Sequence, residues 1–121
     1  LTLSARHNYR GEVQINAGTL NVTANNTGFH NTVTLANASG AILNIGGNAV
    51  HIYGLTGGGA SGGNIASTDG GVLTVTSPRA AFNFNGGFTG VGTLTKTGGQ
   101  IFSISGTEKA NGSYDFEDDL Q

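Results

Sequence analysis

Two histidines and one aspartate are the strongest candidates for metal ligands in this chain. His30, His51 and Asp69 follow one another at similar intervals along the sequence. If this spacing places them on neighbouring layers of one fold, two imidazoles and a carboxylate would converge as a zinc site requires. The alternative is that they are polar side chains on a solvated face. We favour this alternative, and we expect no metal site and no cofactor.

A glycine-rich stretch, "GGGASGGN", could be taken for a phosphate-binding loop. It contains a formal G-x-G-x-x-G pattern at Gly57, Gly59 and Gly62. Such a pattern binds phosphate only between a strand and a helix, where the helix N-terminus faces the anion. No helical pattern follows Asn64. The stretch therefore predicts a corner loop and argues against nucleotide binding.

Charged residues are too sparse for the usual hydrolytic sites. Between Thr19 and Val91 the only charged residues are Asp69 and Arg79. A carboxylate pair for glycoside cleavage or an acidic cluster for calcium is therefore missing from this region. A catalytic serine would need a base, and the chain has no G-x-S-x-G motif. We predict that the chain is not an enzyme.

The overall charge and hydropathy exclude two classes of partner. The formal net charge of −2 argues against a surface that binds nucleic acid or anionic lipid. No apolar run approaches the roughly 18 residues of a membrane helix, so we expect no membrane insertion of this segment.

Phe88 is the candidate contact for an organic ligand. It closes the stretch "AAFNFNGGF", in which Phe82 and Phe84 alternate and are expected to share a buried face and to stack with Phe102. Phe88 follows a turn. It is either a core or corner residue, which we favour, or an exposed aromatic that stacks on a sugar ring or a partner chain.

The two ends of the chain carry opposite charges. The basic residues near the start include Arg6 and Arg10, and an acidic tail covers residues 107–121. Its acidic residues include Asp115, Glu117, Asp118 and Asp119. In a rod with open strand edges, such ends could pair head to tail and form a filament. Two alternatives stay open: the chain is cut from a longer protein that covers these edges, or the acidic tail is a solvated cap that prevents stacking.

The elements that would position these residues are short strands. Apolar residues alternate with polar ones in pairs such as Val13/Ile15, Leu43/Ile45 and Leu73/Val75, and Gly, Asn, Ser or Thr clusters separate the pairs. No helical stripe is present. Low charge combined with recurring Val, Ile and Thr favours an ordered chain over a disordered one. We predict an all-β fold with essentially no helix.

The spacing of these strands points to a repeat of about 20 residues, a period found in solenoid proteins. Two interleaved sets of apolar positions advance at this step: Leu20, Leu43, Ile65, Phe84 and Phe102, and Val33, Val50, Leu73, Leu94 and Tyr114. Such a period is typical of a parallel β-solenoid, whose strands stack about 4.8 Å apart. We therefore expect about six rungs. An antiparallel sandwich is the rival, but Gly-Gly is commoner here than the Asn-Gly turns of that fold.

Two stretches resemble the passenger-associated repeat of bacterial autotransporters. "GTLTKTGGQIFSISG" is similar to the family's G-T-L-T-K-x-G stretch and the short strand after it, which ends in S-G. "LTLSARHNYRGEVQINAGTLNV" is similar to the family's L-T-L-S-G-x-N-x-Y-x-G-x-T-x-I-N-x-G-T-L run. The second stretch departs at Ala5, where the family favours glycine. The first departs at residues 99–101, and the family's N-x-Y-x-G turn is replaced by "EKANGSYDF". Together the two stretches cover roughly a third of the chain.

The resemblance implies a right-handed parallel β-helix that is exported across the Gram-negative envelope and then displayed or released. Passengers of this kind serve mostly as stalks, adhesins and spacers. The chain starts at Leu1 without a signal peptide, so we expect residues 1–121 to be one solenoid domain or a segment of a longer passenger. We predict a structural rod, secreted or on the cell surface, that supports adhesion or assembly. The alternatives are a filament subunit and a glycan-binding module.

Overall fold

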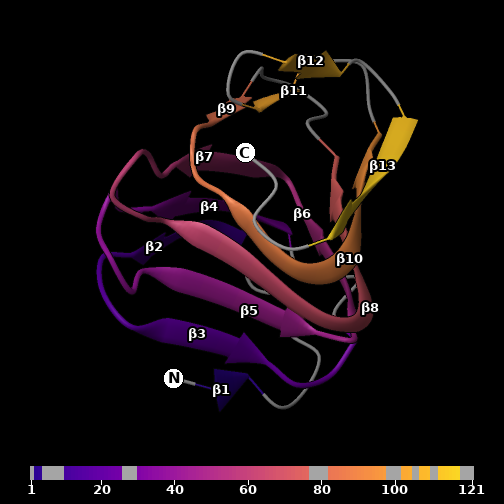
Figure 1. Cartoon of the computed structure of the whole chain (residues 1–121), viewed down its shortest axis with the longest axis horizontal. Coiled ribbons are helices and arrows are strands. Elements are labelled where there is room, and N and C mark those ends of the chain that lie inside the picture. Colours follow the sequence, from indigo (N-terminus) through magenta and orange to yellow (C-terminus); the bar gives the residue numbers. More distant parts are fainter. Residues whose placement is uncertain are drawn as a thin grey trace.

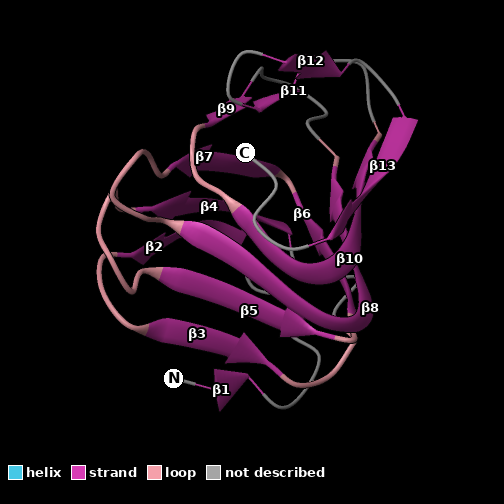
Figure 2. Cartoon of the chain, in the orientation of Figure 1, coloured by secondary structure: helices cyan, strands magenta, loops and turns pink. Residues whose placement is uncertain are grey.

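A computed structural model describes residues 2–3, 10–25, 30–76, 82–97, 102–104, 107–109 and 112–117. These residues form strands joined by turns and loops, with no helix among them (Figure 2). The part of the chain described in this way therefore contains no helix long and apolar enough to cross a membrane.

The strands form two sheets, and the chain winds from one sheet to the other (Figure 1). The first sheet contains, in spatial order, β1 (Thr2–Leu3), β3 (Thr19–Val22), β5 (Ile42–Gly46), β8 (Asn64–Val75), β10 (Phe88–Lys96) and β13 (Gly112–Glu117), with β6 (Ala49–Ile52) beside β8. The second contains β2 (Arg10–Ile15), β4 (His30–Leu35), β7 (Gly54–Gly57), β9 (Phe82–Phe84), β11 (Phe102–Ile104) and β12 (Thr107–Lys109).

Neighbouring strands from successive turns pair in parallel, which is the pairing of a β-solenoid. The long strands β8 and β10 bend, so that the start of β8 pairs with β5 and its end pairs with β6. The turns that begin at β5, β8 and β10 thus carry strands on three faces. The predicted fold class is confirmed.

The predicted number of rungs is too high. Among the described residues five strands of each sheet stack in parallel and about three turns are complete, whereas the sequence indicated about six rungs. The turns are longer than the period inferred from the sequence, as the pairing of Leu43 with Ile65 and of Ile65 with Phe88 shows. In addition, the last two strands run antiparallel to the stack and form no further turn.

The register confirms part of each predicted set of stacked residues. Leu20, Leu43 and Ile65 are partners on successive turns, as expected, but the next partner is Phe88 and not Phe84. Phe84 belongs to the second sheet, where it pairs with Gly57.

In the second predicted set of stacked residues, every residue except the first, Val33, has the expected partner. Val50, Leu73, Leu94 and Tyr114 are partners in sequence order, although Tyr114 lies on an antiparallel strand. Val33 instead pairs with Leu55 in the other sheet.

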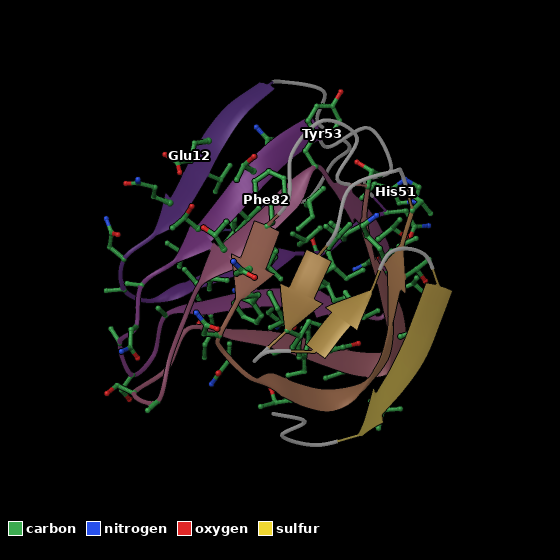
Figure 3. The ribbon with its side chains drawn as sticks, turned by 90° about the horizontal axis from the view of Figure 1, so that it is seen from above. Glu12, His51, Tyr53 and Phe82 are labelled. Carbon is green, nitrogen blue, oxygen red and sulfur yellow. The ribbon has the colours of Figure 1, made fainter. Side chains whose placement is uncertain are left out.

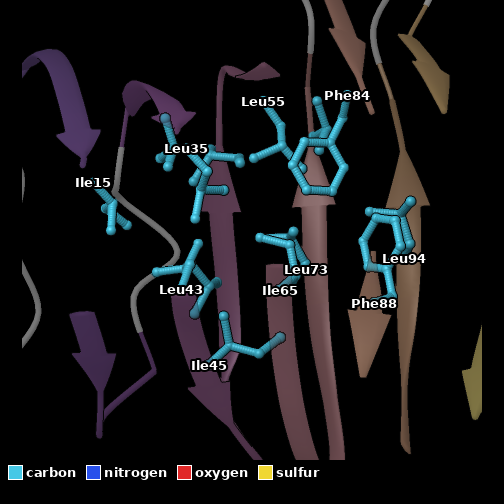
Figure 4. Packing of buried hydrophobic residues seen from close by; sticks show 14 of the residues in the cluster. Ile15, Leu35, Leu43, Ile45, Leu55, Ile65, Leu73, Phe84, Phe88 and Leu94 are labelled. Atoms are coloured by element: carbon cyan, nitrogen blue, oxygen red, sulfur yellow. The ribbon is translucent and has the colours of Figure 1, made fainter. Parts of the chain in front are cut away.

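The core fills the space between the sheets. Alternate residues of β3, β5 and β6 are buried, as expected of strands with one face turned inward. Leu43 and Ile65 from the first sheet and Leu55 from the second are buried in this space (Figure 4). Each fully buried aliphatic or aromatic side chain of this kind contributes about 1.5–3 kcal/mol through the hydrophobic effect. Stability is therefore spread along the stack, with every turn contributing.

Candidate functional site

The register contradicts the alternative in which His30 and His51 occupy equivalent positions on adjacent turns. His51 in β6 has Thr74 as its partner on the next turn, and His30 in β4 has Arg10. The register therefore assigns the two histidines to different columns of the solenoid. Among the described residues no group of three or more His, Cys, Asp or Glu is placed to hold a metal ion. His7 lies outside the described residues.

The glycine-rich stretch forms a tight corner, as predicted. Gly59 and Gly62 bridge each other in antiparallel fashion, and β8, not a helix, follows. The backbone N–H of Gly58 donates to the Leu35 carbonyl at 2.8 Å, and that of Ser61 donates to Asn37 Oδ1 at 2.8 Å. Because these N–H groups already have acceptors, the corner is not an open cradle for phosphate.

This corner requires glycine because successive turns approach closely there. A Cβ on Gly63 would lie 2.5 Å from the Gly58 Cα, and a Cβ on Gly58 would lie 2.5 Å from the Gly86 Cα. Glycines from two turns therefore lie in direct backbone contact. Their role is to let the turns stack, which is a structural role.

Phe88 is a core residue, which corrects the alternative that it is an exposed ligand contact. Its exposed fraction is 0%, and its ring packs edge-to-face against Phe84 with centroids 5.4 Å apart. It follows a turn, but it also continues the inward column of Leu43 and Ile65. The residues next to Phe88 in the sequence, such as Gly90, could not reveal its inward position. The residue that shows it is Ile65, which lies one turn away.

The outer face of the second sheet carries a connected row of polar side chains. The Glu12 carboxylate accepts hydrogen bonds from Gln14 Nε2 at 3.1 Å and from Thr34 Oγ1 at 2.9 Å. Thr34 in turn lies 3.1 Å from the Thr56 hydroxyl. Since Thr34 donates to Glu12, Thr56 must donate to Thr34. Three successive turns are thus linked by a directed chain of hydrogen bonds.

Two further polar columns lie on the faces of the first sheet. Asn44 Nδ2 donates to Asn21 Oδ1 of the preceding turn at 3.0 Å. On the face formed by β6, His51 is followed by Thr74, which is buried, and then by Thr95. His51 and Tyr53 lie on a different side of the molecule from Glu12 (Figure 3). The outside of the solenoid therefore offers hydroxyl, amide and imidazole groups on several faces.

A hollow lies beside the turn that joins β2 to β3. It has a volume of about 250 Å³ and is lined by residues 13–20. None of these residues is acidic, basic or a histidine. The residues that line the hollow therefore provide no carboxylate, imidazole or amine for acid–base chemistry or for activating the Thr19 hydroxyl.

Lys96 is a buried cation that the sequence analysis did not single out. Its exposed fraction is 2%, and its partner on the preceding turn is Val75, itself partnered by Ile52. A lysine thus continues a column of aliphatic residues inside the solenoid. Its Nζ donates a hydrogen bond to the Thr97 carbonyl. The alternation of Leu94 and Lys96 was the available signal for this inward position.

Stability should depend on pH through Lys96. Burial lowers the pKa of its ammonium group below the ordinary value. Between the lowered pKa and the ordinary value of about 10.4, the unfolded chain binds more protons than the folded chain. The free energy of unfolding should therefore rise with pH in this interval. We expect Lys96→Met to lose this rise, as measured by urea unfolding at neutral and alkaline pH. An equal rise in both proteins would contradict the prediction.

The charged ends are only partly described. Arg10 begins β2, and Asp115 and Glu117 lie in β13, so these residues belong to strands at opposite ends of the stack. Arg6, Asp118 and Asp119 lie outside the described residues. Contact between charged ends of different molecules stays a prediction.

Comparison with known proteins tests the resemblance to autotransporter passengers. No protein-family model and no solved structure matches the chain. A curated relative, the adhesin BmaC autotransporter of Brucella suis biovar 1 (strain 1330), is 35% identical over 120 residues, which covers 93% of this chain. The resemblance to autotransporter passengers is confirmed. The β-solenoid is the architecture that this resemblance implied.

The matched part of the relative is small. This autotransporter-like chain spans about 4% of the length of the adhesin that it matches. The similarity therefore concerns one stretch of solenoid turns, and the activity of the whole relative enters only as a proposal for this chain.

Proposed function

We propose that this chain is a rigid, non-enzymatic stretch of an adhesin-type autotransporter passenger, secreted or displayed outside the outer membrane of a Gram-negative bacterium. The observation that carries the proposal is the 35% identity to an autotransporter adhesin along almost the whole chain. The sparse charge of the middle region supports a structural role over a catalytic one.

The geometry supports a rod that holds its faces in fixed positions. Each inner strand pairs with the turns before and after it, so that a local opening must break two ladders of hydrogen bonds. The polar row of Glu12, Thr34 and Thr56 adds side-chain links across the same turns. A stack built in this way can hold a binding surface far from the membrane without bending.

Adhesion would then use the side faces of the rod. These carry hydroxyl, amide and imidazole groups, which exchange hydrogen bonds with a polar surface and bury little apolar area. The glycan-binding alternative relied on an exposed Phe88, and that residue is buried. We therefore do not propose it as a separate function.

The test is display of the chain on a non-adherent Gram-negative host, fused to an autotransporter translocator domain. We expect added protease to remove the chain from intact cells and the displayed chain to raise attachment to host-cell layers several-fold. The control is Gly57→Val, which should disturb the corner and abolish attachment at equal expression. If the wild-type chain is displayed and folded but gives no more attachment than the empty translocator, the adhesive role is wrong, and a spacer role is all that remains.

A further inference from the structure

The two sheets end in the same unusual way. β13 pairs antiparallel with β10, and β12 pairs antiparallel with β11, whereas the stacked strands before them pair in parallel. β13 and β12 are also the outermost strands of their sheets at this end (Figure 1). Both sheets thus change direction at their last strand.

The reversed strands occupy the edge that a further turn would use. All six residues of β13 have partners in β10, from Val91 to Lys96, and all three residues of β12 have partners in β11. The backbone groups of an edge strand are the template on which another strand adds. Here that template is filled by the chain itself.

Local sequence accounts for the reversal of β12. Only two residues, Ser105 and Gly106, separate the partners Ile104 and Thr107. A two-residue connection can join antiparallel strands, whereas a parallel return needs a dozen residues or more. Ser-Gly is also a common turn dipeptide.

The interior next to β13 also disfavours a further turn. Lys96 lies in the inner column that Ile52 and Val75 begin, and its partner in β13 is Gly112. An additional turn in register would place another residue over a buried ammonium group, where an apolar side chain offers it no acceptor. Glycine at this place adds no side chain.

The new outer edges have features that discourage pairing. β12 is only three residues long and contains Glu108 and Lys109, and β13 contains Asp115 and Glu117. Natural sheets protect exposed edges with short strands and charged residues of this kind.

We propose that β12 and β13 together form a cap that ends stacking in this segment and prevents head-to-tail growth. This inference does not depend on the adhesive role. With one end capped, association through the opposite edges, at β1 and β2, stops at a closed pair of molecules, whereas a filament needs both ends to be open.

The test compares the intact chain with two variants that change residues of β12 and β13. Sedimentation velocity and negative-stain microscopy are applied to each protein over a concentration series. The double substitution Tyr114→Pro/Asp115→Pro removes two neighbouring backbone N–H donors. Because successive N–H groups of a strand point to opposite sides, one of the two faces β10, and its loss should release β13. Glu108→Gln/Asp115→Asn/Glu117→Gln keeps the backbone and removes charge. The control, Asp118→Asn/Asp119→Asn, removes two acids that follow β13 in the sequence.

We expect the intact chain and the control to stay at one or two copies. The proline variant should grow several-fold in mass, into elongated particles, and the charge variant should grow at high concentration. Filaments of the intact chain would overturn the proposal and favour the head-to-tail alternative. The proposal is equally wrong if the charge variant, folded by circular dichroism, sediments like the intact chain at every concentration.

Discussion

Gly57→Ala is expected to remove most or all of the stability of the chain. Gly57 has a φ of +92°, which costs an alanine about 1–2 kcal/mol. The added Cβ would also lie 2.0 Å from the Leu35 carbonyl oxygen, a backbone atom of the preceding turn. The turns would have to move apart at the corner, and we expect a total loss of more than about 4 kcal/mol, the range of severe single substitutions.

Gly40→Ala is the matched control for this substitution. Gly40 has a similar φ of +86°, but a Cβ there would meet nothing within 4 Å. Only the backbone cost of about 1–2 kcal/mol should appear. Urea unfolding followed by circular dichroism measures both proteins. Equal losses at the two positions would show that close stacking at Gly57 is unimportant, and would also weaken the use of Gly57→Val as a control for adhesion.

Phe84→Ala is expected to cost about 3–5 kcal/mol, as truncations of a buried phenylalanine do. Phe84 has an exposed fraction of 0%, and its ring meets Phe88 at 72° with centroids 5.4 Å apart. Domains of ordinary stability have only about 5–15 kcal/mol in total, so this loss would be a large part of it. The cavity would lie in the core between the two sheets.

Val91→Ala is the control for Phe84→Ala. Val91 is 51% exposed, and its truncation should change the free energy of unfolding by no more than about 0.5 kcal/mol. A double-mutant cycle of Phe84→Leu and Phe88→Leu should give a coupling of about 0.5–1.5 kcal/mol from the edge-to-face contact. A loss below about 1 kcal/mol for Phe84→Ala would mean that this part of the solenoid is loosely packed.

Both predictions concern the same requirement of the proposed rod. Its side faces can act as a fixed surface only if successive turns stay in contact, at the glycine corner and in the core alike. A loosened turn would displace the polar row that runs from Glu12 to Thr56, because this row is built across turns. Loss of attachment should therefore accompany loss of stacking.

The sequence by itself determined the strands, their approximate period and the resemblance to autotransporter passengers. Alternation of apolar residues is a local property of a strand with one buried face, and it needs no knowledge of the partner strand. The same holds for the glycine corner, since "GGGASGGN" has no local tendency to form a helix. The near-absence of charge in the middle region is likewise a property of the sequence, and it argues against catalysis whatever the fold.

Only the tertiary structure decided which strands are neighbours and which side chains they bury. The spacing between partners is wider for Gly57 and Phe84 than for Leu43 and Ile65, because corner loops differ in length. Each change of spacing moves a residue into another column, and this is why the similar intervals between His30, His51 and Asp69 do not place His30 and His51 in one column. The inward position of Phe88 and the reversal of β13 follow from contacts between strands, whereas the two-residue connection before β12 is itself a local signal for its reversal. The contacts between turns join residues far apart in the sequence, and no local pattern contains them.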